Sequence, residues 1–195
     1  MDSQNDEPGE EGMPTNDCAP ATVFGAANEG AVLPALDCGD HFAKQGFYRA
    51  GVKTVTLEGQ PIEVWYPVRA SSVEGRQKAV YNMKDWLPAS LASEIPDSEC
   101  TKMEMEAYRD VAIEEGPFPV VLFSHGLAGY RMQSSAVMAH LATWGFIVAA
   151  PEHEERGLAV ILETGTPTGD DAPATLEATL DLLTSLNEND ATFGG

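Results

Sequence analysis

The feature that most constrains this chain of 195 residues is a pair of short apolar runs separated by a glycine-bearing turn and an amphipathic segment. The first run, residues 120–123, has the continuous apolar character of a strand buried on both faces of a parallel sheet. After the turn at residues 124–130, residues 132–144 have helical apolar spacing and residues 146–150 form the second run. A strand, a helix and a strand within about 35 residues predict a βαβ unit with a right-handed crossover.

Further elements are predicted on both sides of this unit. Residues 52–57 alternate between apolar and polar, turn-forming residues follow, and residues 62–68 form a second strand that is closed by Pro67, so an antiparallel hairpin is expected. A helix is predicted over residues 174–186. Its buried stripe is expected to contain Leu176, Leu180, Leu183 and Leu186.

The remaining segments complete an α/β fold with helices on both faces of the sheet. Short helices are predicted over residues 85–93 and 102–109, and a long polar loop is predicted over residues 152–173. In open α/β sheets ligands bind beyond the carboxyl ends of the strands, which is where this loop emerges.

Negative charge is concentrated at the N-terminus. Residues 1–40 hold nine Asp and Glu and no Lys or Arg, and the net charge of the whole chain is −20. Residues 1–45 are expected to be a largely disordered acidic segment, because they cannot bury enough apolar surface to offset their ordering entropy. Residues 46–195 are expected to form the folded part. The charge argues against a nucleic-acid partner, and no apolar run approaches the ~18 residues of a membrane-spanning helix.

The N-terminal sequence and the cysteines carry information about the cellular compartment of the protein. No secretion signal is visible at Met1, but acidic Pro/Gly-rich segments of this kind often follow a removed signal. A secreted, periplasmic or lipoprotein-anchored location is therefore expected. Cys18, Cys38 and Cys100 lack metal-site spacing. A Cys18–Cys38 disulfide and free buried thiols are both compatible with the sequence.

The turn at residues 124–130 is the expected place of chemistry. A glycine-bearing turn between a buried strand and a helix can expose backbone N–H groups that stabilise the oxyanion of an acyl-transfer reaction. Here the turn contains His125, Gly126 and Gly129.

Three segments carry a resemblance to a known family. They are residues 63–67 (EVWYP), 119–127 (PVVLFSHGL) and 145–153 (GFIVAAPEH). Together they resemble the α/β-hydrolase superfamily, in the dienelactone-hydrolase-like branch that includes platelet-activating-factor acetylhydrolases and cutinase-like polyester hydrolases, over residues 47–187. The resemblance implies a serine ester hydrolase that acts on a small-molecule or polymer ester without a metal or organic cofactor.

The resemblance also assigns roles. The implied oxyanion and substrate-binding residues are Leu127, Gly126, His125, Tyr130 and Arg131. The backbone N–H of Leu127 would bind the oxyanion, Tyr130 or Arg131 would line the acyl side, and Glu152 and His153 would shape the cleft. Ser124 and His125 are neighbours at a strand end and should point to opposite faces, so they are not expected to act together as nucleophile and base.

The catalytic triad is the part of the family pattern that this sequence lacks. No Gly-x-Ser-x-Gly elbow occurs in residues 1–195, so the resemblance places the nucleophile, the acid and the histidine downstream. The chain is accordingly expected to be an N-terminal half that is inactive alone. The alternative is a non-catalytic or split module that binds a partner chain, such as a complementary C-terminal half. No metal site is expected, because His153 and the acidic residues near it lack ligand spacing.

Overall fold

The computed structural model describes residues 41–96, 98–99, 101–190 and 192–193. The predicted acidic segment up to residue 40 and all three cysteines lie outside this part. The strands are β1 (Arg49–Leu57), β2 (Gln60–Val68), β3 (Val80–Asn82), β4 (Lys102–Glu104), β5 (Tyr108–Arg109), β6 (Val120–Leu122) and β7 (Ile147–Pro151). The helices are α1 (Ala89–Glu94), α2 (Ser135–Thr143), α3 (Leu158–Thr164) and α4 (Ala172–Asn189), with 3-10 turns η1 (His41–Ala43), η2 (Ala70–Val73) and η3 (Met83–Trp86).

The central sheet has the strand order β5-β1-β2-β7-β6. Strands β1 and β2 form the predicted antiparallel hairpin around a tight turn at Glu58 and Gly59, whose φ angles are both positive. Strand β2 includes Pro67 and ends one residue later, at Val68, as the sequence predicted. Strands β6 and β7 pair in parallel and are joined by α2, which confirms the βαβ unit and the α/β class.

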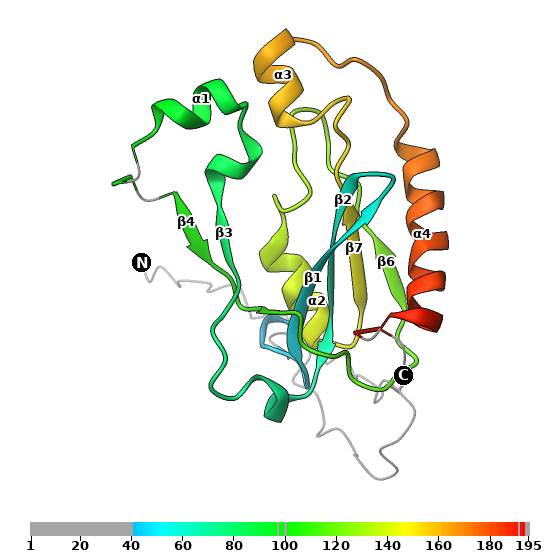
Figure 1. The fold of residues 1–195 in the computed structure, drawn as a ribbon. Helices are drawn as coiled ribbons and strands as arrows, with labels where there is room; N and C mark the ends of the chain where they lie inside the picture. The colour runs from blue at the N-terminus through cyan, green and yellow to red at the C-terminus, as the bar shows by residue number, and fades with distance from the viewer. Residues whose placement is uncertain (1–40, 97, 100, 191, 194–195) are drawn as a thin grey trace, which may run out of the picture.

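The alternation of side chains along β2 builds a core on each face of the sheet. Trp65 lies in one cluster with Met138 and Ala142 of α2. Val64 and Tyr66 lie in the other cluster, against which Leu183 and other leucines of α4 pack. Helices α2 and α4 therefore cover opposite faces of the sheet, as expected (Figure 1).

Two predictions of local structure were wrong. Residues 102–109 form β4 and β5 rather than a helix. The signal was present, because Met103, Met105 and Ala107 recur at every second residue, which is the period of a strand. The segment predicted as a long polar loop contains α3, whose residues are all partly or fully exposed and which ends at Gly165 in the left-handed conformation.

The burial of residues at one sheet edge also differs from the prediction. Strand β6 was expected to be buried on both faces, but it pairs only with β7, and Val120 is 41% exposed. Leu180 of α4, predicted to be buried, is 46% exposed and lines a groove beside this edge. Both residues are more exposed than predicted for one reason. In the described part of the chain, β6 has a neighbouring strand on one side only.

Replacing Gly51 by alanine should destabilise the fold. An added Cβ atom would press against the ring of Tyr66 and lie 2.6 Å from Val68 Cγ1, in the core of the β1–β2 hairpin. Such overpacking costs about 2 kcal/mol of unfolding free energy, measurable by urea denaturation. Gly169→Ala, whose Cβ would make only ordinary contacts, is the matched control and should change stability by less than about 0.5 kcal/mol. Equal stability of the two variants would contradict the packing described here.

Candidate active site

The turn that follows β6 contains one backbone N–H group that has no hydrogen-bond acceptor within the described residues. Residues 126–129 form a tight turn closed by a 3.0 Å hydrogen bond from Gly129 N to Gly126 O, with Ala128 at a φ of 55°. The Ala128 amide donates to Arg156 O over 2.9 Å. The Leu127 amide between these groups has no acceptor within the described residues, and the Leu127 side chain is 64% exposed. The turn thus holds a free N–H group at the carboxyl end of β6.

His125 lies behind this turn rather than on its surface. The side chain is 1% exposed. Its Nδ1 lies 3.0 Å from Gly126 O, and its Nε2 accepts the His153 amide over 2.9 Å. Each ring nitrogen thus contacts a main-chain group, one in the turn and one just after β7. His125 therefore supports the backbone of the turn, and the structure does not present its ring to a substrate.

Arg131 and Glu152 form an ion pair beside the turn. The Arg131 amide and guanidinium both donate to Glu152 Oε2, over 3.2 and 2.9 Å, and Glu152 Oε1 lies 3.2 Å from His125 Nε2. Burial acts to raise the pKa of Glu152, but the interactions with His125 and Arg131 outweigh it and hold the pKa below its ordinary value. The charge of Arg131 is thus largely matched by Glu152.

Tyr130 and Arg131 reach a cavity of about 490 Å³. The Tyr130 ring stacks on the indole of Trp86 at a centroid distance of 4.2 Å. Trp86 comes from η3, and Leu158 of α3 also lines the cavity. The cavity therefore lies between the turn after β6, the η3 segment and α3. Gly126 and Leu127 are not among its lining residues.

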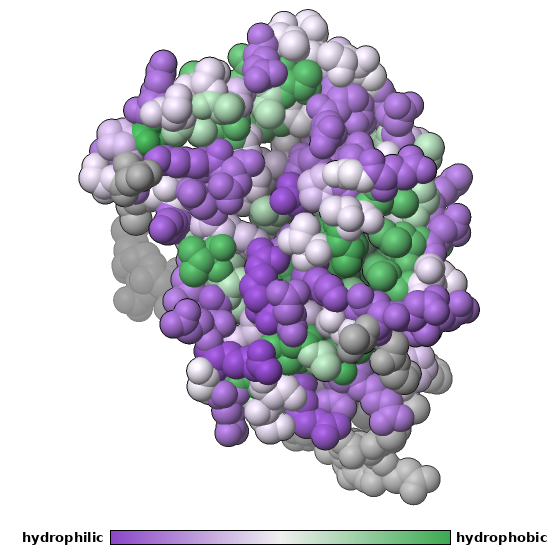
Figure 2. All heavy atoms as spheres, viewed as in Figure 1, coloured by the Kyte–Doolittle hydropathy of each residue, from purple (hydrophilic) through white to green (hydrophobic). Residues whose placement is uncertain are grey.

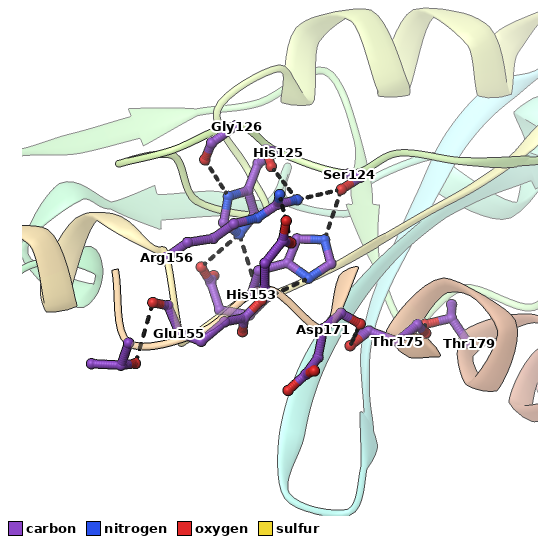
Figure 3. A network of polar contacts seen from close by, with 12 residues as sticks. Ser124, His125, Gly126, His153, Glu155, Arg156, Asp171, Thr175 and Thr179 are labelled. Carbon is purple, nitrogen blue, oxygen red and sulfur yellow. Dashed lines mark hydrogen bonds and ion pairs between the residues drawn. The ribbon is translucent and has the colours of Figure 1, made fainter. Parts of the chain in front are cut away.

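A second polar cluster, which sequence reasoning missed, joins the ends of β6 and β7. Ser124 Oγ lies 2.9 Å from His153 Nε2 and accepts a 2.7 Å hydrogen bond from Arg156 Nη2 (Figure 3). Glu155 Oε1 is 3.8 Å from His153 Nδ1, too far for a hydrogen bond. These residues come together only because β6 pairs in parallel with β7, so no local sequence motif predicts the cluster.

His153 is fully buried in this cluster and was predicted only to shape the cleft. An arginine can only donate, so the Ser124 hydroxyl that accepts from Arg156 can give its own proton to His153 Nε2. Burial, followed by the nearby His125 and Arg156, lowers the pKa of His153 below 6.5. A neutral His153 that accepts from Ser124 agrees with both observations.

The stability of the fold should decrease as the pH is lowered from 7.5 to 5. The folded state keeps His153 neutral, so its contribution is complete above the ordinary histidine pKa of 6.5 and is lost as the unfolded chain takes up the proton. The pKa of Glu152 is also lowered, so protonation of its carboxylate reduces the stability further at still lower pH. Urea denaturation across this range measures the slope, and His153→Gln should flatten it between pH 6.5 and 5. A stability that is constant or rises toward pH 5 would contradict this account.

No group of three or more His, Cys, Asp or Glu side chains among the described residues is arranged to hold a metal ion. No helix in the same part of the chain is long and apolar enough to cross a bilayer.

The sequence of residues 52–175 matches the protein family described as platelet-activating factor acetylhydrolase, isoform II. The chain belongs to this family. The match runs from β1 into the start of α4 and includes the turn after β6. It confirms the resemblance to platelet-activating-factor acetylhydrolases that the three sequence segments indicated.

Individual curated proteins are similar to this chain over shorter stretches. The platelet-activating factor acetylhydrolase of Cavia porcellus is 48% identical over 42 residues, which cover 22% of this chain and 10% of that protein. A Schizosaccharomyces pombe protein whose name describes a phospholipase A2 is 29% identical over 105 residues, 52% of this chain and 22% of that protein. The chain thus matches less than a quarter of the length of these curated relatives.

A solved structure is also similar. The ferulic acid esterase from Streptomyces cinnamoneus aligns with a TM-score of 0.44 and 16% sequence identity. The alignment covers 74% of this chain and 48% of that chain.

Proposed function

We propose that this chain supplies the oxyanion-binding part of a serine ester hydrolase. The observation that carries the proposal is the Leu127 amide, which has no acceptor among the described residues and lies in a hydrogen-bonded turn at the carboxyl end of β6. Membership of the platelet-activating factor acetylhydrolase family supports the ester-hydrolase class. The names of the relatives favour phospholipid or other carboxylic esters as substrates.

In this proposal the Leu127 amide acts on the charge that develops during acyl transfer. A serine attacks the ester carbonyl, and the carbonyl oxygen becomes an oxyanion that the Leu127 N–H group can bind. A histidine takes the serine proton and returns it to the leaving alcohol, and water then releases the acyl group. Tyr130 and Trp86, in the adjacent cavity, lie where they could contact part of the ester. The triad is proposed to come from polypeptide beyond residue 195.

Labelling with a fluorophosphonate tests where the nucleophile lies. The 195-residue chain alone is expected to show no labelling and no burst with p-nitrophenyl acetate. A polypeptide that continues into a Gly-x-Ser-x-Gly sequence should be labelled on that serine and should hydrolyse the ester. Stoichiometric labelling of a serine within residues 1–195 would refute the proposed origin of the nucleophile, and a longer, folded polypeptide without hydrolysis would refute the ester-hydrolase proposal itself.

A second candidate is a binding module, and the open edge of β6 favours it. Apolar side chains gather in a hollow over β6 and α4 (Figure 2), where a groove of about 750 Å³ is lined by Phe118, Val120, Ile147, Leu180 and Leu183 among others. Such an edge can pair with a further strand. Helix α2 and helix α4 lie on opposite faces, so a right-handed crossover from β7 through α4 would carry a following strand past β6 to this free edge.

The two candidates differ in what the groove would accept. We expect a complementary C-terminal half, covalent or separate, to cover it in an active hydrolase. Co-expression of residues 1–195 with that half should then restore esterase activity and fluorophosphonate labelling. A stable complex without either would favour the binding module.

A further inference from the structure

Arg156 connects the segment after β7 to the turn after β6 through its side chain. Its Nη2 donates to Ser124 Oγ over 2.7 Å and to His125 O over 2.9 Å (Figure 3). Its Nη1 donates to Asp170 Oδ1 over 3.2 Å. The guanidinium thus holds the two residues that directly precede the Gly126–Gly129 turn.

The backbone of the same segment holds the other side of the turn. Arg156 O accepts the Ala128 amide over 2.9 Å, and Gly129 O accepts the Leu158 amide over 2.8 Å. Gly129 and Gly157 form a parallel bridge. Leu127 therefore lies between two segments that are held by hydrogen bonds, residues 124–125 and residues 128–129. Arg156 contributes hydrogen bonds to both segments.

The partners of Arg156 are unusual for a residue that serves stability through charge. Its side chain is mostly buried, yet two of its three acceptors are a neutral hydroxyl and a neutral carbonyl. The third acceptor, Asp170, is largely exposed, and exposed ion pairs contribute little to stability. The arrangement restrains the geometry of the turn more than it balances charge.

We infer that Arg156 is the positioning residue for the Leu127 amide. It fixes the backbone on both sides of Leu127, so that the free N–H group keeps one direction while the ester reacts. Arg156 itself does not touch the substrate in this arrangement. The catalytic consequence rests on the proposed oxyanion role of Leu127, whereas the restraint on the turn does not.

Arg156→Met tests the inference with two readouts. In the 195-residue chain, amide hydrogen exchange of residues 124–129 should become at least about tenfold faster, because the side-chain anchor is lost. In a longer polypeptide that carries the triad, kcat should fall about 10- to 100-fold with little change in KM, because a misplaced donor weakens transition-state binding only. Arg156→Lys keeps a donor and should recover part of both effects.

Two controls isolate the effect. Arg69→Met removes an arginine that is remote in sequence from this turn and forms an ion pair with Glu114. It should leave both readouts unchanged. Asp170→Asn removes only the exposed ion pair and should likewise change little. Ser124→Ala removes one acceptor and keeps the charge, so it replaces Arg156→Met if that variant does not fold, and it should speed exchange to a smaller degree.

The outcomes separate the two proposals. Unchanged exchange in residues 124–129 of a folded Arg156→Met variant would overturn the positioning role, whatever the activity. Faster exchange with an unchanged kcat would overturn its catalytic consequence. Absence of hydrolysis in the unmutated longer polypeptide would count against the proposed function, while the exchange measurement would still decide whether Arg156 restrains the turn.

Discussion

Leu127→Pro is expected to lower kcat for ester hydrolysis at least about 100-fold in a polypeptide that contains the triad, with KM nearly unchanged. Proline lacks the backbone N–H group, and loss of one oxyanion donor typically costs about 3–4 kcal/mol in the barrier. An effect confined to kcat identifies an interaction made only in the transition state. The measurement is steady-state hydrolysis of p-nitrophenyl acetate.

The position of Leu127 in the turn makes this substitution selective. Leu127 is the second residue of the 126–129 turn, its φ is not positive, and Ala128 after it has a φ of 55°. Proline is favoured at the second position of such turns, so the backbone should keep its path. Leu127→Ala, which keeps the N–H group, is the matched control and should retain most of kcat. Equal rates for the two variants would show that the Leu127 amide does not bind the oxyanion.

Arg109→Met should lower the free energy of unfolding by about 3 kcal/mol, because it removes the cationic partner of a buried carboxylate. Glu63 is fully buried at the centre of the sheet, and Arg109 Nη1 lies 2.6 Å from its Oε1. Hydroxyl groups of Thr54 and Tyr81 also donate to Glu63, over 2.6 and 3.0 Å. Burial, and then the charge of Glu63, raises the pKa of Tyr81, so Tyr81 remains a donor.

A double-mutant cycle distinguishes this charge effect from a loss of packing. Glu63→Gln in the Arg109→Met background removes the stranded charge and should recover part of the lost stability. Glu63→Gln alone should cost less than Arg109→Met, because Arg109 is 34% exposed and can be hydrated. Urea denaturation of the four proteins gives the coupling energy, expected at about 1–3 kcal/mol. Additive effects would show that the ion pair contributes no specific interaction.

The backbone elements that carry strong periodicity could be predicted from the sequence. The apolar runs around residues 120–123 and 146–150 predicted the parallel pair, and the alternation before Pro67 predicted the hairpin. The α3 helix was missed because its seven residues, although mostly apolar, are too few to show a helical period and are flanked by turn-forming residues. The β4 and β5 strands were missed because Lys, Met, Glu and Ala in residues 102–107 have high helix propensity, which obscures the two-residue alternation.

The side-chain cluster beneath the turn could not be predicted in the same way. Ser124 meets His153 and Arg156 across about thirty residues of chain, and this contact depends on the register of β6 against β7. The sequence does show which residue types lie near each strand end, but not which ones touch. The Leu127 amide was singled out from the family resemblance, and the structure adds that its N–H group has no acceptor among the described residues.

The most direct test is a crystal structure of a triad-containing polypeptide after reaction with an ethyl p-nitrophenyl phosphonate. The phosphonyl oxygen of the adduct occupies the place of the oxyanion. We predict that this oxygen lies about 2.7–3.1 Å from Leu127 N, with the turn still anchored to Arg156. An adduct whose oxygen points away from Leu127, or a Leu127 amide bonded to another group of the protein, would contradict the account.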